Sequence, residues 1–240
     1  MIEGQRVLAV VPARGGSKGI PLKNLRPIGG TPLVTLAGQV AGAVAEIDRA
    51  IVSTDHSEIA EAARLGGLEV PFTRPSEISG DRIGDHEVLS HALKAMEDLD
   101  GTTYDIIVML QPTSPGRTAE HVQRTLRHLV DGTFDAVWTV SETDSKSHPL
   151  KQLVISTEGA LDYYDPAGSQ VIARQDLAPL YHRNGVAYAI TRECLVGKGT
   201  IKGDRCGAVV LHEPLPNIDT ELDLAWVEFL MQRSGAGPTS

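Results

Sequence analysis

The sequence predicts an α/β fold, a Rossmann-like three-layer sandwich in which a mostly parallel sheet lies between two layers of helices. Short apolar, valine-rich runs alternate with segments of helical periodicity over most of the 240 residues. The apolar runs lack the polar–apolar alternation of a half-exposed sheet, which indicates strands buried on both faces. The alternation breaks once, between about residues 141 and 180, which indicates a small inserted arm.

The first half of the chain carries the signals of three strands and three helices. RVLAVVP at residues 6–12 is an uninterrupted apolar run, as expected for a central strand. The next helix is expected to start with Thr31 as N-cap and Pro32 at its first position. The expected strands are 6–12, 49–53 and 69–73, and the expected helices are 32–46, 58–65 and 85–98.

The second half continues this pattern to residue 140 and resumes it near residue 181. The interruption contains a predicted hairpin at 150–156 and 161–164, joined by a Glu158-Gly159 turn. The remaining expected strands are 105–110, 135–140, 185–191 and 207–212, and the remaining helices are 119–130 and 220–233. We therefore assign residues 1–140 and 181–233 to one α/β domain, 141–180 to an inserted flap or dimerisation arm, and 234–240 to a disordered tail.

Composition restricts the classes of function. The net charge of −9 and the pI near 5.3 disfavour nucleic acid and anionic membranes as partners. No signal peptide is recognisable, and no apolar stretch approaches the length of a membrane span, so we expect a cytoplasmic protein without membrane contact. The two cysteines have no metal-ligand spacing and do not suggest a disulfide framework.

A glycine-rich, basic loop follows the first strand directly, at residues 13–24 (ARGGSKGIPLKN). In a parallel sheet this position is the carboxyl edge, where ligands bind. Its glycines can adopt positive φ and let backbone N–H groups approach an anion closely, and its cations would compensate phosphate charge. These residues are Gly15, Gly16 and Gly19, and Arg14, Lys18 and Lys23. The loop matches neither a Walker A motif nor GxGxxG; we predict that it binds phosphates, the alternative being a basic surface turn.

The loop resembles the signature of the acylneuraminate cytidylyltransferase (CMP-sialic acid synthetase) family, approximately A-R-x-G-S-K-G-x-x-x-K-N. Further matches follow in the family's order and span nearly the whole chain. They are Ser53-Thr-Asp55, Arg74-Pro75, Leu110-Gln-Pro-Thr-Ser-Pro-x-Arg117, Arg174-Gln175, Tyr181-x-x-Asn-Gly-x-x-Tyr188 and Ile218-Asp-Thr-Glu-Leu-Asp223.

The resemblance implies that the chain transfers CMP from CTP to the anomeric hydroxyl of a nonulosonic, sialic-acid-like sugar acid and releases pyrophosphate. The nucleotide would bind at Ala13, Arg14, Gly15, Gly16, Ser17, Lys18, Asn24 and Arg74, with Arg14, Lys18 and Lys23 as the catalytic cations. The sugar acid would bind at Gln111, Lys151, Arg174 and Tyr188. A guanidinium beside cytosine can donate to its O2 and N3 atoms, and one facing a carboxylate can bind it in a bidentate manner.

The resemblance also implies Mg²⁺ as cofactor and a homodimer in which each arm helps complete the partner's acceptor site. Many family members hold the metal with Asp-x-Asp, but this chain has Asn217 and Asp219, so an amide replaces one carboxylate. We expect Asp219 to be the principal ligand. Thr220 and Asp223 are explained without metal, as a variant capping box.

Several alternatives remain open. The acceptor could be a neuraminic, legionaminic, pseudaminic or octulosonic acid, or a phosphonate. Family members that bind N-acetylneuraminate often have an aromatic pair where this chain has 199–201, and its absence here argues against N-acetylneuraminate itself. The chain could also be a non-catalytic nucleotide-binding protein on the same fold. Structural roles compete with the proposed ones: Tyr188 as core, Arg117 in an ion pair, Lys151 in solvent, Asp81 as a helix cap, and Thr54, Asp55 or Ser57 as caps of helix 58–65. No spacing favours a general base among His86, His148 and His182.

Overall fold

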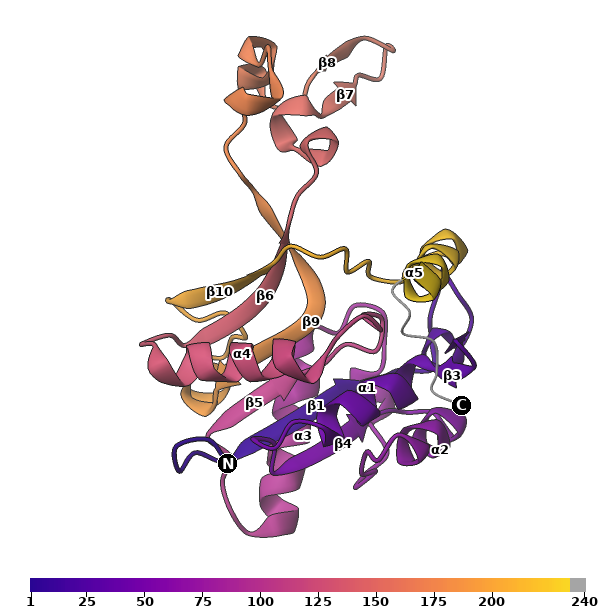
Figure 1. Cartoon of the computed structure of the whole chain (residues 1–240), viewed down its shortest axis with the longest axis vertical. Helices are drawn as coiled ribbons and strands as arrows, with labels where there is room; N and C mark the ends of the chain where they lie inside the picture. Colours follow the sequence, from indigo (N-terminus) through magenta and orange to yellow (C-terminus); the bar gives the residue numbers. More distant parts are fainter. Residues whose placement is uncertain (234–240) are drawn as a thin grey trace.

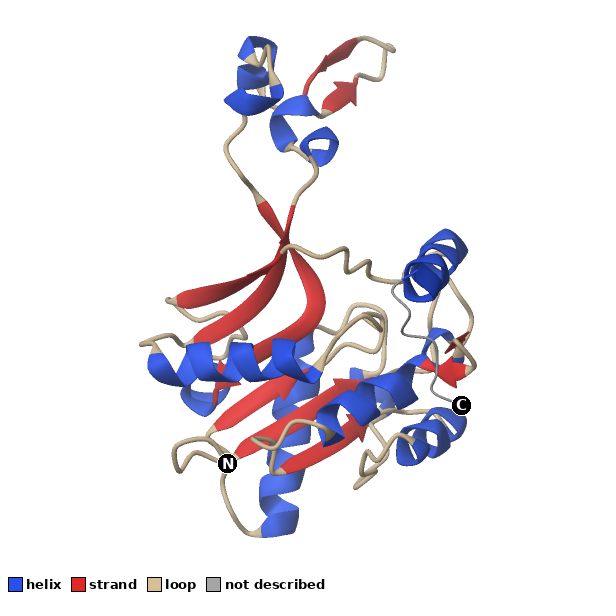
Figure 2. Ribbon diagram, viewed as in Figure 1, coloured by secondary structure: helices blue, strands red, loops and turns tan. Residues whose placement is uncertain are grey.

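The computed structural model describes residues 1–233; the tail predicted at 234–240 lies outside them. Its main sheet has six strands in the order β10-β6-β9-β5-β1-β4 (Figure 2). β1 is parallel to β4 and β5, and β10 is parallel to β6, whereas β9 is antiparallel to both of its neighbours. The strands are β1 Val7–Pro12, β4 Arg49–Ser53, β5 Ile106–Met109, β6 Ala136–Glu142, β9 Tyr181–Thr191 and β10 Cys206–Leu211.

Helices cover both faces of this sheet (Figure 1), which confirms the predicted three-layer α/β fold. One core lies between the sheet and α1, α2 and α4; the other lies between the sheet and α3 with the short π-helical turn Glu193–Gly197. The helices are α1 Leu33–Gly42, α2 Ser57–Leu65, α3 Asp85–Asp100, α4 Ala119–Asp131 and α5 Glu221–Arg233. Short 3₁₀ helices lie at Lys23–Leu25, Ser76–Ile78, Ser145–Ser147, Pro149–Lys151, Pro166–Gln170 and Arg174–Asp176.

Four predicted elements differ from the structure. The first hairpin strand, expected at 150–156, is confined to Leu153–Ile155, because Pro149–Lys151 forms a 3₁₀ turn. The helix expected at 32–46 ends at Gly42, and Thr31 does not cap it, because Thr31 belongs to β3 (Thr31–Pro32), which pairs with β2 (Pro27–Ile28). The strand expected at 69–73 is reduced to a single bridge between Ile51 and Glu69. β9 begins at Tyr181, four residues before the expected start, because it continues into the arm beside β6.

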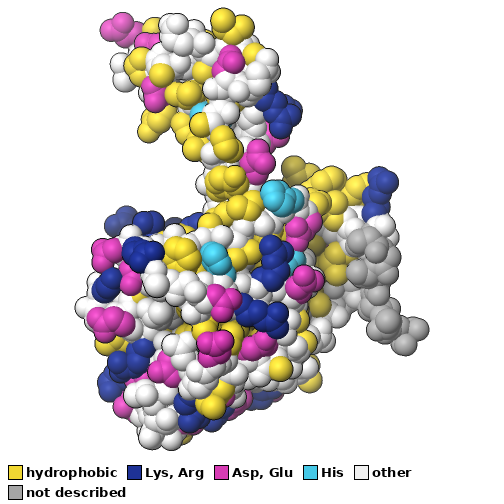
Figure 3. Space-filling view, turned by 60° about the vertical axis from the view of Figure 1, so that its left-hand side comes forward, with side chains coloured by type: hydrophobic (Ala, Val, Ile, Leu, Met, Phe, Trp, Pro, Cys, Tyr) yellow, Lys and Arg dark blue, Asp and Glu magenta, His cyan; other side chains and the backbone are white. Residues whose placement is uncertain are grey.

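The segment 143–180 connects β6 to β9 and stands away from the sheet (Figure 1). It contains the small hairpin of β7 (Leu153–Ile155) and β8 (Leu161–Tyr163). Because β6 and β9 lead into and out of this arm side by side, β9 runs antiparallel within an otherwise parallel sheet. Apolar side chains gather on the surface of the arm (Figure 3) and include Ile155, Tyr164 and Ile172.

A third, small core holds the carboxyl edge of the sheet together. Ile20, from the glycine-rich loop, is fully buried against Ile28, Leu33 and Ile218, and α5 adds Leu224. The glycine-rich loop and the segment before α5 are therefore packed against each other although about 200 positions separate them. This packing brings the predicted phosphate loop and the predicted metal ligands to the same place.

Candidate active site

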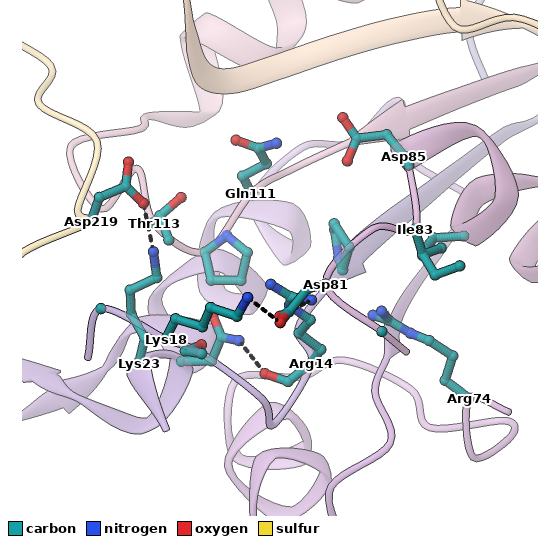
Figure 4. A pocket seen from close by; sticks show the side chains of 18 of the residues that line it. Arg14, Lys18, Lys23, Arg74, Asp81, Ile83, Asp85, Gln111, Thr113 and Asp219 are labelled. Atoms are coloured by element: carbon teal, nitrogen blue, oxygen red, sulfur yellow. Dashed lines mark hydrogen bonds and ion pairs between the residues drawn. The ribbon is translucent and has the colours of Figure 1, made fainter. Parts of the chain in front are cut away.

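A cavity of about 560 Å³ opens at the carboxyl ends of β1 and β5 (Figure 4). Four segments line it: the glycine-rich loop, residues 74–88, the segment 111–113 after β5, and the segment before α5. Of the predicted site residues, the cavity brings together Arg14, Ser17, Lys18, Lys23, Asn24, Arg74, Gln111, Asn217 and Asp219. Their convergence places four cationic side chains around one space.

Each cation of the glycine-rich loop is paired with a carboxylate. Arg14 Nη1 lies 2.9 Å from Asp81 Oδ1, and Lys18 Nζ lies 2.7 Å from Asp81 Oδ2. Lys23 Nζ donates to Asp219 Oδ1 at 2.8 Å and to the carbonyl of Ile218 at 2.7 Å. Lys18 and Arg14 hold the pKa of the Asp81 carboxyl below its usual range.

The loop is fixed by contacts at both of its ends. The Gly15 N–H donates to Asp55 Oδ1 at 2.9 Å, and the Asn24 side-chain amide donates to the Arg14 carbonyl at 3.0 Å. Asp55 therefore anchors the loop, and the expectation that it, Thr54 or Ser57 caps α2 is wrong, since no side chain caps that helix.

Close packing requires glycine at two of the loop's positions, Gly15 and Gly19, and none of Gly15, Gly16 and Gly19 adopts the positive φ that glycine allows. A Cβ at Gly15 would lie 2.8 Å from the His56 ring, and one at Gly19 would lie 2.4 Å from the backbone oxygen of Asp219. The left-handed residue of the loop is instead Leu22, with φ 47°, immediately before Lys23 and Asn24. The turn at Leu22 directs both of these side chains into the site.

The remaining predicted nucleotide residues occupy different positions. The Ala13 N–H donates to the Ser53 carbonyl at 2.9 Å, so Ala13 extends the sheet, and neither it nor Gly15 and Gly16 is among the residues that line the cavity. Arg74 does line it, although it is 4% exposed and donates to the hydroxyl and the carbonyl of Ser53. Burial lowers the Arg74 pKa to about 10.

Gln111 lies where β5 leaves the sheet and approaches an irregularity in the pairing of β6 with β9. There the backbone of Gly185 has φ 75°, and the Gln111 N–H donates to the Gly185 carbonyl at 3.3 Å. Arg117 is buried beneath this point and donates to the carbonyls of Gln111, Gly185 and Val186. The predicted ion pair of Arg117 is absent from residues 1–233, because its hydrogen bonds go to carbonyls.

The other predicted acceptor residues do not reach this cavity. Tyr188 is fully buried, its ring lies 5.4 Å from that of Trp138 in a tilted arrangement, and its hydroxyl accepts a hydrogen bond from the Gly185 N–H at 2.6 Å. Lys151 and Arg174 both belong to the arm, which stands away from the sheet (Figure 1), and neither lines the cavity of its own chain.

The residues before α5 have a donor set that suits Mg²⁺. The Oδ1 atom of Asn217 is buried and accepts no hydrogen bond from residues 1–233, and the Asp219 carboxylate is exposed in the same cavity. Asp223 is occupied elsewhere, since it accepts hydrogen bonds from Thr220 and from the Asp219 N–H, which confirms the capping box. No cluster of three or more Asp, Glu, His or Cys within residues 1–233 could hold a metal, so a magnesium ion here would depend on substrate oxygens and water.

Several residues of the cavity were missed from sequence. Asp81 does not cap α3, whose N-cap is Gly84. Ile78, Ile83 and Val88 supply an apolar wall. The only local signal is the pair of glycines, Gly80 and Gly84, that brackets Asp81 after the Arg74-Pro75 motif. The three histidines considered as bases, His86, His148 and His182, are not among the residues that line the cavity.

The fold and the cavity define a nucleotide-binding α/β protein: a mostly parallel sheet with convergent cations and a glycine-rich loop at its carboxyl edge. The chain belongs to the Cytidylyltransferase family, whose family profile matches residues 8–206. The CMP-N,N'-diacetyllegionaminic acid synthase of Legionella pneumophila subsp. pneumophila is 30% identical over 95% of this chain and 97% of its own length. The pseudaminic acid cytidylyltransferase of Campylobacter jejuni subsp. jejuni is 26% identical over 93% of this chain and 95% of its own length.

A solved structure shares the fold at lower identity. CMP:2-keto-3-deoxy-manno-octonic acid synthetase complexed with CTP superposes with a TM-score of 0.67 and 20% identity, covering 95% of this chain and 99% of that one. Within residues 1–233, no helix is long and apolar enough to span a bilayer.

Proposed function

We propose that this chain transfers CMP from CTP to the anomeric hydroxyl of a nonulosonic, sialic-acid-like sugar acid, with release of pyrophosphate. The observation that carries the proposal is the convergence of Arg14, Lys18, Lys23 and Arg74 on one cavity at the carboxyl edge of the sheet. Family membership and the names of the full-length relatives support the same reaction.

The reaction forms one bond and breaks one at the α-phosphorus of CTP. The anomeric oxygen attacks this atom and gives up its proton to solvent, while the bond to the β-phosphate oxygen breaks and its electrons leave with pyrophosphate. Repulsion between the acidic acceptor and the triphosphate opposes this approach. Arg14, Lys18 and Lys23 would offset that charge in a partly enclosed site, where fixed cations act more strongly than in water.

Magnesium is part of the proposal. Asp219 and Asn217 would hold it, and the bound ion would supply Lewis-acid charge to phosphate oxygens. Lys23 now pairs with Asp219, the expected ligand, and would be free to contact a phosphate when that carboxylate held a metal. Removal of divalent ions with EDTA is expected to abolish turnover, and added Mg²⁺ is expected to restore it; full activity in EDTA would contradict the metal assignment.

The experiment that tests the function is an assay of pyrophosphate release from CTP with a panel of acidic acceptors. The panel contains N-acetylneuraminic, N,N'-diacetyllegionaminic, pseudaminic and octulosonic acids and a phosphonate. We expect turnover with a nonulosonic acid and with CTP in preference to UTP. Turnover with the octulosonic acid alone, or with the phosphonate alone, would contradict a nonulosonic acceptor and assign the chain to that other acceptor. Binding of CTP without turnover on any acceptor would favour a non-catalytic protein.

A homodimer is the second part of the proposal. Lys151 and Arg174 are predicted to bind the acceptor but lie on the arm, and the arm exposes Ile155 and Ile172 to solvent, at 73% and 95%. If a second copy covers the apolar arm, Lys151 and Arg174 of the first copy would lie beside the cavity of the second copy.

Mixing two inactive variants tests this arrangement. Lys18→Ala damages the cavity, and Arg174→Ala damages the arm. If sites are shared, denaturing and refolding the two together restores about one quarter of wild-type activity, because half of the dimers are mixed and each has one intact site. Activity no higher than that of the separate variants would contradict a shared site.

A further inference from the structure

Asp81 lies between two of the cations that the proposed triphosphate needs. Its two carboxylate oxygens contact Arg14 Nη1 at 2.9 Å and Lys18 Nζ at 2.7 Å. Figure 4 shows the three side chains meeting inside the cavity, well apart from the pair of Lys23 and Asp219. The carboxylate therefore offers the glycine-rich loop the same kind of two-oxygen contact that a phosphate group would offer.

Within residues 1–233, no other contact gives this carboxylate a structural role. α3 begins at Asp85 with Gly84 as N-cap, so Asp81 is not a helix cap. The salt bridges of Asp81 within residues 1–233 are the two to the glycine-rich loop. By contrast Asp85, which also lines the cavity from the same segment, is paired with Arg183 at 2.9 Å.

The contacts of Asp81 are of a kind that a ligand can replace. The Lys18 side chain is 79% exposed and that of Asp81 is 39% exposed. Ion pairs with this degree of exposure are individually weak, and each exchanges readily with solvent or with a competing anion. A polyphosphate brings more negative charge to Arg14 and Lys18 than one carboxylate does.

We infer that Asp81 is a positioning residue that holds Arg14 and Lys18 in place before the nucleotide arrives and then competes with its β- and γ-phosphates for them. This inference rests on the proposed function. A ligand that reaches both cations must displace Asp81, and its affinity is reduced accordingly. A ligand that carries only the base, the ribose and the α-phosphate leaves the pairs intact. Asp81 thus weakens the binding of CTP and of the product pyrophosphate but not the binding of CMP. The weaker binding of pyrophosphate favours its release after the reaction.

Calorimetric titration of Asp81→Asn with CTP, pyrophosphate and CMP tests the inference without an acceptor. We expect the Kd of CTP and of pyrophosphate to fall roughly 3- to 30-fold, the scale of two exposed ion pairs, while the Kd of CMP stays within about 2-fold. If the role of Asp81 were merely structural, Asp81→Asn would weaken the binding of all three ligands or leave all three Kd values unchanged.

Asp85→Asn is the matched control, because it removes the same charge from the same segment without releasing Arg14 or Lys18. Its CTP affinity is expected to rise by no more than about 2-fold, from the general loss of negative charge. Asp81→Ser is a second variant, and thermal unfolding verifies that each protein is folded.

The inference is overturned if Asp81→Asn and Asp81→Ser bind CTP no more tightly than the wild type. It is also overturned if Asp81→Asn increases the affinity for CMP as much as the affinity for CTP. The same holds if Asp85→Asn increases the affinity for CTP as much as Asp81→Asn does. Failure of the wild type to bind either CTP or pyrophosphate would overturn the proposed function itself, so the two failures are distinguishable.

Discussion

The absent side chain of Gly185 leaves the space that the Gln111 amide occupies. A Cβ on Gly185 would lie 2.6 Å from Gln111 Oε1 and 2.6 Å from Ser114 Oγ, and the Gly185 backbone has φ 75°. Both observations require glycine here, one through space and the other through backbone conformation. The Asn-Gly pair at the start of the β9 irregularity is therefore tied directly to the direction in which Gln111 points.

Gly185→Ala is expected to raise the KM of the sugar acid at least about 10-fold while the Kd of CTP stays within about 2-fold, because Gln111 is displaced and the phosphate loop is not. Steady-state kinetics and CTP titration measure the two effects. Gly159→Ala is the control, since Gly159 also has positive φ but its Cβ would meet no atom within 4 Å. Equal changes in the KM of the sugar acid and in the Kd of CTP would contradict a role of Gly185 in binding the acceptor.

Arg117 supports the same region from below. It is 5% exposed, and its guanidinium satisfies three carbonyls that belong to two different segments. Arg117→Ala is expected to reduce the free energy of unfolding by about 2–4 kcal/mol, because buried carbonyls lose their donors. Urea unfolding measures this. Arg64→Ala, on the exposed face of α2, is expected to change it by less than about 1 kcal/mol; similar values for both variants would refute the structural role of Arg117.

Lys18, unlike Arg117, is expected to contribute to activity and little to stability. Its side chain is 79% exposed and pairs only weakly with Asp81. Lys18→Ala is therefore expected to leave the melting temperature nearly unchanged but to lower kcat/KM by at least about 10²-fold, the scale of losing one preorganised donor to developing charge. A folded variant with near wild-type turnover would remove Lys18 from the mechanism.

Acid stability depends on a pair far from the cavity. Asp135 accepts hydrogen bonds from Lys198 and from the N–H groups of Asp204 and Arg205, and Lys198 is the main cause that lowers its pKa from 3.8 to about 2. Because the folded-state pKa is the lower one, this pairing stabilises the fold above about pH 4 and is lost as the pH falls towards about 2. Asp135→Asn should be less stable than the wild type near pH 6, and the difference should shrink on acidification. Parallel stability curves over that range would contradict this.

The layered fold could be predicted because buried parallel strands are local signals that need no partner to be recognised. The failures concern pairing across the chain. The segment expected as a strand at 69–73 contributes only Glu69 to β4, and nothing in its composition reveals that. α1 ends early because the chain must return to the sheet, where the Asp48 carboxylate accepts from the Val7 N–H at 2.7 Å.

In the site, the basic loop was predictable because cations and glycines after a buried strand are a contiguous signal. Asp81 was not, since a carboxylate among phosphate-binding cations is no motif, and its position depends on how residues 79–84 fold over the loop. The close approach of Gly19 to Asp219 is likewise a tertiary contact between distant segments. Lys151 and Arg174 lie on the arm, as their positions in the sequence predict. The cavity that they would reach in the proposed homodimer belongs to a second chain, and the sequence alone does not position that chain.

The most direct test of the account is calorimetric titration of the wild-type protein with CTP, UTP and ATP in the presence of Mg²⁺. The account predicts a single CTP site per chain, with CTP bound at least about 10-fold more tightly than either of the other nucleotides, the scale of one satisfied base-specific contact. Lys18→Ala should weaken that binding. No binding of CTP, or equal affinity for all three nucleotides, would contradict the assignment of this cavity to CTP.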